Sequence, residues 1–227
     1  MQIEILPDAA SVAHAAARLV AAEANAAVKA RGRFLLAVSG GQTPWEMLRA
    51  LTSENVQWPA VHIFQVDERV APSGHADRNL THLQAALSHA LLRSEQIPAM
   101  PVEAADLEAA AAQYAAELAA LAGSLPVLDL VHLGLGADGH TASLVPGDPV
   151  LDVTNRHVAI TGEYQGRRRM TLTYPLINRA RKILWLATGA AKAPMLARLR
   201  AADPTIPAGR VRQENAVILA DAAAVGA

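Results

Sequence analysis

Short apolar runs alternate with longer alanine-rich stretches along most of this chain. The apolar runs are short, and the one at 127–133 is rich in β-branched residues, which is typical of buried strands, whereas the alanine-rich stretches have the composition of helices. Strands are predicted at 34–38, 61–66, 127–133, 157–161, 170–173, 182–187 and 216–220, and helices at 9–29, from residue 44, at 80–92 and at 109–122. This alternation predicts an α/β fold with a mostly parallel, twisted sheet and helices on both of its faces.

The length and composition predict a folded chain with one large core. Of the 227 residues, 52% are hydrophobic and 18% are charged, and neither a linker nor an internal repeat interrupts them. We therefore expect a single α/β domain over residues 1–227. The sequence does not set the oligomeric state, and we expect a monomer or a weak homo-oligomer.

Charge, cysteine content and the N-terminal sequence limit the partners and the location. A formal net charge of −1 and a pI near 6.7 give no electrostatic reason to expect nucleic acid or an anionic membrane as the partner. The chain has no cysteine, so it can form neither disulfides nor thiolate metal sites. The N-terminal residues MQIEILPDAA do not resemble a signal peptide, and no unbroken apolar run approaches the length of a membrane helix. We expect a cytoplasmic protein.

Four polar or glycine-rich segments each follow a predicted strand. They are Ser39-Gly40-Gly41, Asp67-Glu68-Arg69, the stretch from Gly134 to His140, and Thr188-Gly189 with Lys192. In open α/β sheets, ligands bind outside the carboxyl ends of the strands, near the switch in strand order. The four segments are therefore predicted to line one crevice, although each motif alone is weak.

The turn at Ser39 indicates the class of ligand. Two glycines let the backbone approach an anion, and the following helix adds free N–H groups and the positive end of its dipole. Thr43 and Glu46 form a predicted capping box, with Pro44 at the first helical position. A tight turn that needs glycine for its geometry alone would look the same. The lysine of a P-loop and the dinucleotide fingerprint are both missing, so a phosphate is expected rather than a nucleotide.

Basic and ionisable side chains complete the predicted crevice. Lys192 and Arg169 could neutralise a phosphate dianion, whereas Arg167 and Arg168 are expected in a solvated loop. A histidine has an unperturbed pKa of about 6.5, so His140 is a candidate general base. Asp67 offers a carboxylate from the neighbouring strand end, although charged triplets such as Asp67-Glu68-Arg69 are mostly surface loops. The other histidines lack metal-ligand spacing and no serine elbow is present, so water is the expected nucleophile and no metal is expected.

Five motifs in order along the chain resemble those of the 6-phosphogluconolactonase family, and together they extend over nearly its whole length. They are SGGQTP, DERVAP, GLGADGHTASLVPG, RMTLTYPLIN and TGAAKAPML. That family is similar to the glucosamine-6-phosphate deaminases, and the resemblance implies a Rossmann-like fold with a sugar-phosphate crevice. The deaminases have a glutamate five residues after their histidine, where this chain has Val145. They also follow their aspartate with glutamate and tyrosine, where this chain has Asp67-Glu68-Arg69. Both differences favour a lactonase. Arg78 and Gln42 depart from residues that are often serine in the family.

The resemblance implies hydrolysis of 6-phospho-D-glucono-1,5-lactone to 6-phosphogluconate without a cofactor. His140 would activate water, and either Asp138 or Asp67 would orient its imidazole. The phosphate would be held by Ser39, Gly40, Gly41 and Thr43 of the turn together with Arg169 and Lys192, and Arg69 would bind the phosphate or the developing charge. Two alternatives are a glucosamine-6-phosphate deaminase or isomerase, which Val145 disfavours, and a non-catalytic sugar-phosphate-binding module, which the presence of both His140 and Asp67 disfavours.

Overall fold

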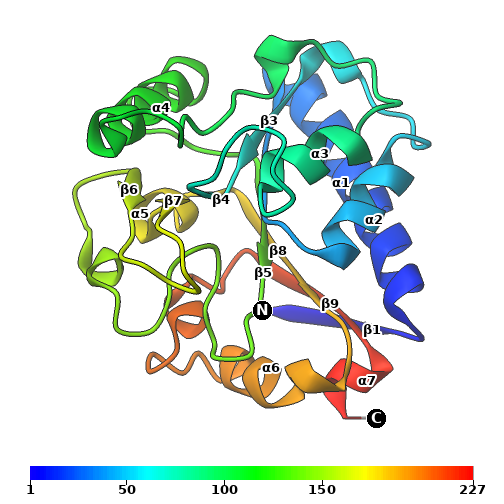
Figure 1. Ribbon diagram of the computed structural model, residues 1–227. Helices are drawn as coiled ribbons and strands as arrows, with labels where there is room; N and C mark the ends of the chain where they lie inside the picture. The colour runs from blue at the N-terminus through cyan, green and yellow to red at the C-terminus, as the bar shows by residue number, and fades with distance from the viewer. Residues whose placement is uncertain (227) are drawn as a thin grey trace.

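A six-stranded parallel sheet forms the centre of the computed structural model, which describes residues 1–226 (Figure 1). Its strands lie in the order β1-β9-β8-β5-β2-β3, and their bounds are β1 Gln2–Leu6, β2 Phe34–Val38, β3 Val61–Gln65, β5 Leu130–Gly134, β8 Lys182–Ala187 and β9 Ala216–Asp221. The predicted α/β fold with a mostly parallel sheet is confirmed. From β2 the chain adds β3 on one side, and β5, β8 and β9 follow on the other. The order of the strands therefore reverses between β2 and β5.

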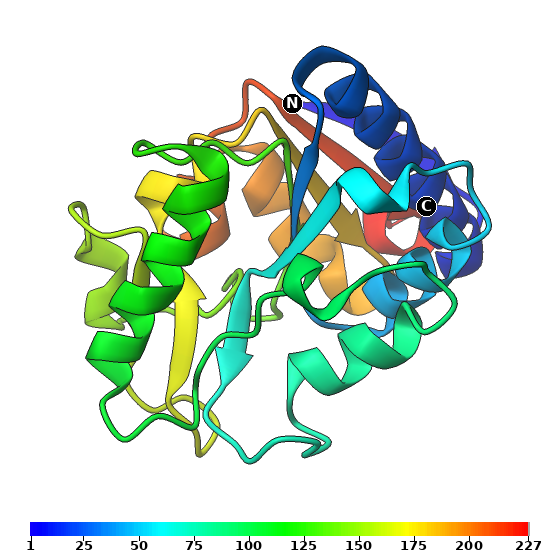
Figure 2. The same ribbon diagram turned by 90° about the horizontal axis from the view of Figure 1, so that it is seen from above.

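Helices cover both faces of this sheet (Figure 2). One face packs against α1 (Ala9–Arg31), α2 (Gln42–Leu51) and α3 (Asn79–Ala86), and the other against α4 (Leu107–Ala122), α5 (Tyr174–Ile177), α6 (Ala193–Arg200) and α7 (Ala222–Val225). Each face has its own hydrophobic core. Side chains alternate along each strand, so Leu36 of β2 enters the core on the α1 side and Leu35 enters the core on the α4 side. Within residues 1–226, no helix has the length and apolar character needed to cross a membrane.

A second, antiparallel sheet lies beside the first. It consists of β4 (Asp67–Arg69), β7 (Arg169–Leu172) and β6 (Val158–Ile160), in the order β4-β7-β6. The strands predicted at 157–161 and 170–173 therefore exist but do not join the parallel sheet. Val66 connects the two sheets, because its N–H donates to Val38 of β2 and its carbonyl accepts from Leu172 of β7. The residues Asp67 to Arg69, expected as a loop, are thus a strand at the edge of the crevice.

The start of α2 differs from the prediction. Its N-cap is Gly41, with φ 135° and ψ 164°, and the helix begins at Gln42. The predicted capping box is wrong, because Thr43 lies within the first turn and its hydroxyl is 2.9 Å from the hydroxyl of Thr188. Gly41 adopts a backbone conformation that side-chain-bearing residues rarely reach, which lets the helix start earlier. No side chain then caps the first N–H groups of the helix.

Several other helix and strand boundaries also differ from the predicted ones. The helix predicted at 80–92 ends at Ala86, and the following turns leave Leu91 83% exposed. The strand predicted from Val127 begins at Leu130, because the Asp129 carboxylate accepts from the N–H of Leu35 in place of a strand partner. The N-terminal strand β1 was not predicted at all. The long helix α1 agrees with the prediction, with the Asp8 side chain capping its start and Gly32, at φ 74°, ending it.

A buried histidine in β5 makes the stability of the fold sensitive to acid. His132 has no exposed surface, and its Nδ1 accepts a hydrogen bond of 3.3 Å from the N–H of Ser39. Burial lowers the pKa of His132 from 6.5 to about 3. Between these values the unfolded chain holds a proton on this side chain and the folded chain does not, so stability is full above about pH 6.5 and falls as the pH decreases.

Substituting His132→Gln should flatten this pH dependence, since glutamine can accept the same hydrogen bond but does not titrate. The free energy of unfolding should change less steeply below pH 6, by up to about 1.4 kcal/mol per pH unit. Denaturant unfolding at several pH values measures it. The control His14→Gln changes an exposed histidine of α1. Equal slopes for wild type and His132→Gln would show that His132 is not neutral in the folded protein.

Candidate active site

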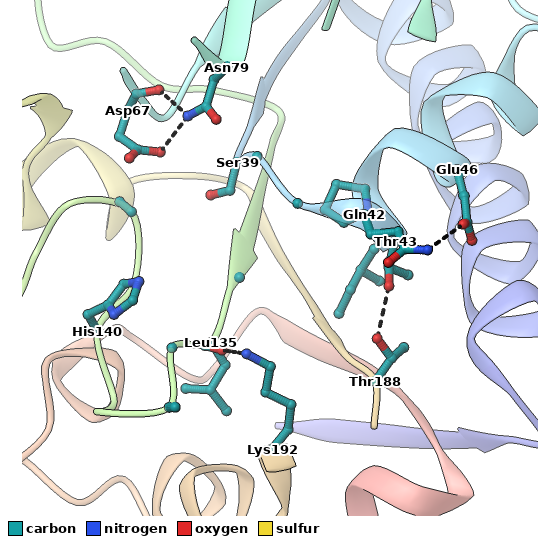
Figure 3. A pocket seen from close by; sticks show the side chains of 18 of the residues that line it. Ser39, Gln42, Thr43, Glu46, Asp67, Asn79, Leu135, His140, Thr188 and Lys192 are labelled. Atoms are coloured by element: carbon teal, nitrogen blue, oxygen red, sulfur yellow. Dashed lines mark hydrogen bonds between the residues drawn. The ribbon is translucent and has the colours of Figure 1, made fainter. Parts of the chain in front are cut away.

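A pocket of about 500 Å³ opens at the carboxyl ends of β2 and β5, where the strand order reverses (Figure 3). Parallel strands end at one edge, so the segments that follow them meet there. The lining includes nine of the ten residues expected from the sequence: Ser39, Gly40, Gly41, Thr43, Asp67, Arg69, His140, Arg169 and Lys192. Asp138 does not line the pocket and lies behind His140. Gly136 and Thr188, from two of the segments predicted to line the crevice, also line it, whereas Asn79 lines it and was not predicted.

His140 and Asp138 form a hydrogen-bonded pair. The Nδ1 atom of His140 lies 2.5 Å from Oδ1 of Asp138, which also accepts from the backbone N–H of His140 at 3.1 Å. Burial raises the pKa of Asp138, but the hydrogen bonds from His140 and from Tyr164 outweigh it and keep this pKa below its usual value. An ionised carboxylate can only accept, so Nδ1 carries the proton. The lone pair of Nε2 is then free to act as a base.

Glycines make room for this pair. A Cβ atom on Gly136 would lie 2.1 Å from Nδ1 of His140 and 2.7 Å from Oδ1 of Asp138. Gly139 has φ 83°, and a Cβ atom there would lie 2.6 Å from Cβ of Ile206. Gly136 and Gly139 therefore let the turn fold tightly enough to place the imidazole against its carboxylate.

Asp67 has other partners. Its Oδ2 accepts from the hydroxyl of Ser143 at 2.6 Å, and its Oδ1 accepts from the side chain of Asn79 at 3.3 Å. Asn79 also donates to the Asp67 carbonyl (Figure 3). Of the two aspartates that could orient His140, Asp138 is the one in contact with it. Asp67 instead lies beside the arginines, where its charge partly offsets the lowering of the Arg169 pKa by burial.

Glu68 has a structural role that the sequence did not reveal. Its side chain is fully buried, which excludes the alternative that the Asp67-Glu68-Arg69 triplet is only a charged surface loop. The buried guanidinium of Arg78, one of the departures from the family pattern, pairs with it at 3.0 Å. Its two oxygens also accept four N–H hydrogen bonds of 2.7–2.9 Å, from the backbone of Arg69, Asn79 and Leu80 and from the side chain of Gln65. This network fixes the backbone on which Arg69 and Asn79 stand.

The basic side chains give the pocket a surplus of positive charge. Arg69 and Arg169 are paired positions on β4 and β7, so their side chains leave the same face of the small sheet. Burial lowers the pKa of Arg169, and the neighbouring charge of Arg69 lowers it further. With Lys192, the lining holds three cations against the carboxylates of Asp67 and Glu46. Like charges on paired positions are unfavourable unless an anion lies between them, so this arrangement favours an anionic ligand.

The start of α2 provides a second anion-binding element on the opposite side of the pocket from His140 (Figure 3). The uncapped N–H groups of its first turn lie at the positive end of the helix dipole. A Cβ atom on Gly40 would lie 2.1 Å from Oδ1 of Asn79, so the turn and the start of α3 can approach only because this residue is glycine. Lys192 reaches in from the segment after β8, and its ammonium donates to the Leu135 carbonyl at 2.6 Å.

The remaining candidates lie outside the pocket. Arg167 pairs with Asp77, and Arg168 donates to the Thr161 carbonyl. Val145 is buried and apolar, so it offers no proton-transfer group at that position. Among residues 1–226, no group of three or more histidine, aspartate or glutamate side chains is arranged to hold a metal ion.

The family follows from comparison with known proteins. Residues 7–219 match the family model described as glucosamine-6-phosphate isomerases/6-phosphogluconolactonase. This chain belongs to that family. A 6-phosphogluconolactonase from Nostoc sp. is 34% identical, with 98% of this chain and 96% of the relative covered, and one from Mycobacterium tuberculosis is 37% identical, with 96% and 95% covered. Both family branches share this fold.

Solved structures of both branches resemble the fold. The 6-phosphogluconolactonase from Trypanosoma cruzi superposes with a TM-score of 0.88 at 25% identity, covering 99% of this chain and 96% of that one. A monomeric glucosamine-6-phosphate deaminase superposes with a TM-score of 0.83 at 20% identity, covering 100% and 99%. The second likeness concerns the fold alone. The residues of the pocket, rather than the fold, must therefore distinguish the two chemistries.

Inorganic phosphate should bind this pocket and raise the midpoint of thermal unfolding, because a ligand that binds only the folded state stabilises it. Lys192→Met should weaken the affinity about tenfold, since hydrogen bonds to charged groups contribute about 1.5–3 kcal/mol. Isothermal titration calorimetry measures the dissociation constant. The control Lys29→Met removes an exposed lysine at the end of α1. If both variants weaken phosphate binding equally, the affinity depends only on the overall charge of the protein.

Proposed function

We propose that this chain hydrolyses 6-phospho-D-glucono-1,5-lactone to 6-phosphogluconate. The observation that carries the proposal is the Asp138–His140 pair, whose free Nε2 belongs to a pocket with surplus positive charge. Relatives named 6-phosphogluconolactonase, 34% and 37% identical over nearly the whole chain, support the same activity. A neutral imidazole beside an anion-binding pocket suits attack of water on a phosphorylated ester.

The proposed reaction needs one base and no cofactor. Nε2 of His140 takes a proton from a water molecule while the water oxygen bonds to the C1 carbonyl carbon, which gives a tetrahedral oxyanion and an imidazolium. The oxyanion then collapses, the bond between C1 and the ring oxygen breaks, and the imidazolium returns its proton to that oxygen. The product is a carboxylic acid that ionises. Asp138 keeps Nδ1 protonated throughout and stabilises the imidazolium.

The phosphate of the substrate supplies orientation. We infer that it lies in the turn formed by Ser39, Gly40, Gly41 and Thr43, with Lys192 and Arg169 as counter-charges. Arg69, paired with Arg169 across the small sheet, binds one of the two anions of the reaction, the phosphate or the oxyanion. Binding energy from the distant phosphate then holds C1 against His140, which converts affinity into rate.

Two alternative functions make different demands on the same pocket. A deaminase would need a carboxylate at the position that Val145 occupies, and Val145 is a buried apolar residue. A non-catalytic sugar-phosphate-binding module would need the cationic surfaces but not a paired histidine and aspartate.

The lactone partner is a small molecule, and the cysteine-free composition supports the cytoplasm as the place of the reaction.

The experiment generates the lactone in situ by enzymatic oxidation of glucose 6-phosphate and follows 6-phosphogluconate with and without the protein. Because the lactone opens spontaneously, only acceleration above the background counts. Release of ammonia from glucosamine 6-phosphate is measured in parallel to test the deaminase. A lactone rate equal to the background would refute the proposal, and binding of sugar phosphates without any turnover would favour the binding module.

His140→Ala should reduce kcat by about 10²–10⁴-fold, which is the usual contribution of a general base. The product should still bind, because the phosphate site lies on the other side of the pocket. Steady-state kinetics and calorimetry with 6-phosphogluconate measure the two effects. Hydrolysis at the wild-type rate would show that His140 is not the base.

Gly136→Ala should lower kcat with little effect on product binding. The new methyl group would overlap Nδ1 of His140 and Oδ1 of Asp138, so the imidazole must move away from its carboxylate. Because His140 and Asp138 are partly exposed, they can move without unfolding the protein, and the thermal midpoint should stay near that of wild type. An unchanged kcat would mean that the pair need not be held at this separation.

A further inference from the structure

Tyr164 lies at the point where the proposed base and the proposed anion-binding arginine come together. Its hydroxyl donates to Oδ2 of Asp138 at 2.9 Å, the oxygen that does not contact His140. Its ring packs edge-on against the imidazole of His140, with centroids 5.6 Å apart and planes at 66°. The guanidinium of Arg169 lies over the same ring, 4.9 Å from its centroid. One side chain thus contacts three groups of the site.

A short hairpin turn holds Tyr164 in this place. Tyr164 and Arg167 pair through two backbone hydrogen bonds, and the intervening Gln165 and Gly166 have φ values of 52° and 76°. Two consecutive residues with positive φ make the tight hairpin turn whose twist suits antiparallel strands. Arg167 ties the turn to the loop between β4 and α3 through its ion pair with Asp77. The Tyr164 side chain therefore projects from a fixed backbone.

We propose that Tyr164 is a positioning residue of the hydrolytic site, whose hydroxyl fixes the Asp138 carboxylate behind His140 and whose ring seats Arg169. This inference rests on the proposed lactone hydrolysis. With both oxygens of Asp138 engaged, the carboxylate cannot rotate away from Nδ1. The ring also shields one side of the imidazole from water and offers its negative face to the guanidinium.

The pKa shifts of Tyr164 and Asp138 agree with a hydrogen bond that Tyr164 donates to Asp138. Burial raises the pKa of the Tyr164 phenol, and the adjacent Asp138 raises it further, so the hydroxyl keeps its proton and donates. Its hydrogen bond in turn helps to keep the pKa of Asp138 below its usual value. The Arg169 charge opposes the rise at Tyr164 but does not reverse it.

Two substitutions separate the hydroxyl from the ring. Tyr164→Phe removes only the hydrogen bond to Asp138, so kcat should fall about tenfold while KM stays within about twofold. Tyr164→Leu also removes the surface under Arg169, so KM should rise about fivefold in addition. Circular dichroism and thermal unfolding confirm that both variants fold. A role confined to stability would lower the thermal midpoint and leave both kinetic constants unchanged, which would overturn the proposal.

Tyr174→Phe is the matched control. The hydroxyl of Tyr174 donates to the Pro207 carbonyl, and the guanidinium of Arg210 lies over the Tyr174 ring, also 4.9 Å from its centroid. Neither Tyr174 nor Arg210 lines the pocket. This variant should lose stability without a change in kcat or KM. An equal fall in kcat for Tyr174→Phe and Tyr164→Phe would contradict a specific role for Tyr164.

A spectroscopic readout separates this inference from the proposed function. The short bond between His140 and Asp138 should place the Nδ1 proton at low field in the proton NMR spectrum, with the signal assigned by its loss in His140→Ala. Tyr164→Phe should shift or broaden that signal, whether or not the lactone is the substrate. An unshifted signal together with an unchanged kcat would refute the positioning role, whereas a shifted signal in a protein without lactonase activity would refute the substrate alone.

Discussion

The parallel alignment of the six central strands is the constraint on which the site depends. All their carboxyl ends emerge at one edge, and because the strand order reverses between β2 and β5, the segments that follow these two strands diverge and leave a pocket. The glycine turn before α2 and the turn that carries His140 therefore face each other. Val66 then connects the small antiparallel sheet to the same edge, which brings the paired arginines of β4 and β7 to the pocket.

Buried polar side chains hold this edge in place. The Glu68 carboxylate is paired with Arg78 and accepts the N–H groups that begin α3, so the strand of Asp67 and the helix of Asn79 are fixed to one another. Removing either member of a buried ion pair leaves an uncompensated charge, which is strongly destabilising. His132 accepts a hydrogen bond from the N–H of Ser39 and so supports the turn that is proposed to bind the phosphate. Asp67, Arg69 and the turn at Ser39 therefore stand on a backbone that buried side chains hold in place, while the first N–H groups of α2 have no side-chain cap.

Most of the main sheet could be predicted from the sequence, because buried parallel strands are continuous apolar runs bounded by turn residues. Two strands of the small sheet were predicted, at 157–161 and 170–173, but their separation from the main sheet was not, because these strands are short and β7 pairs with the distant β4. At α2, the start of the helix was predicted at the Thr43 capping box, whereas the helix begins at Gln42 after Gly41. The residues around the pocket could be predicted from their positions after strands. The choice between Asp138 and Asp67, the burial of Glu68 and the contacts of Tyr164 depend on side-chain directions for which no local pattern gives a signal.

A crystal structure with bound 6-phosphogluconate would test the central claim most directly, because it locates both ends of the ligand at once. The account predicts the phosphate at the Ser39–Thr43 turn, in contact with the first N–H groups of α2 and with Lys192, and the C1 carboxylate within hydrogen-bond reach of Nε2 of His140. A ligand bound with its phosphate against His140, or with C1 remote from that imidazole, would contradict the proposed division of the pocket into an anion-binding side and a water-activating side.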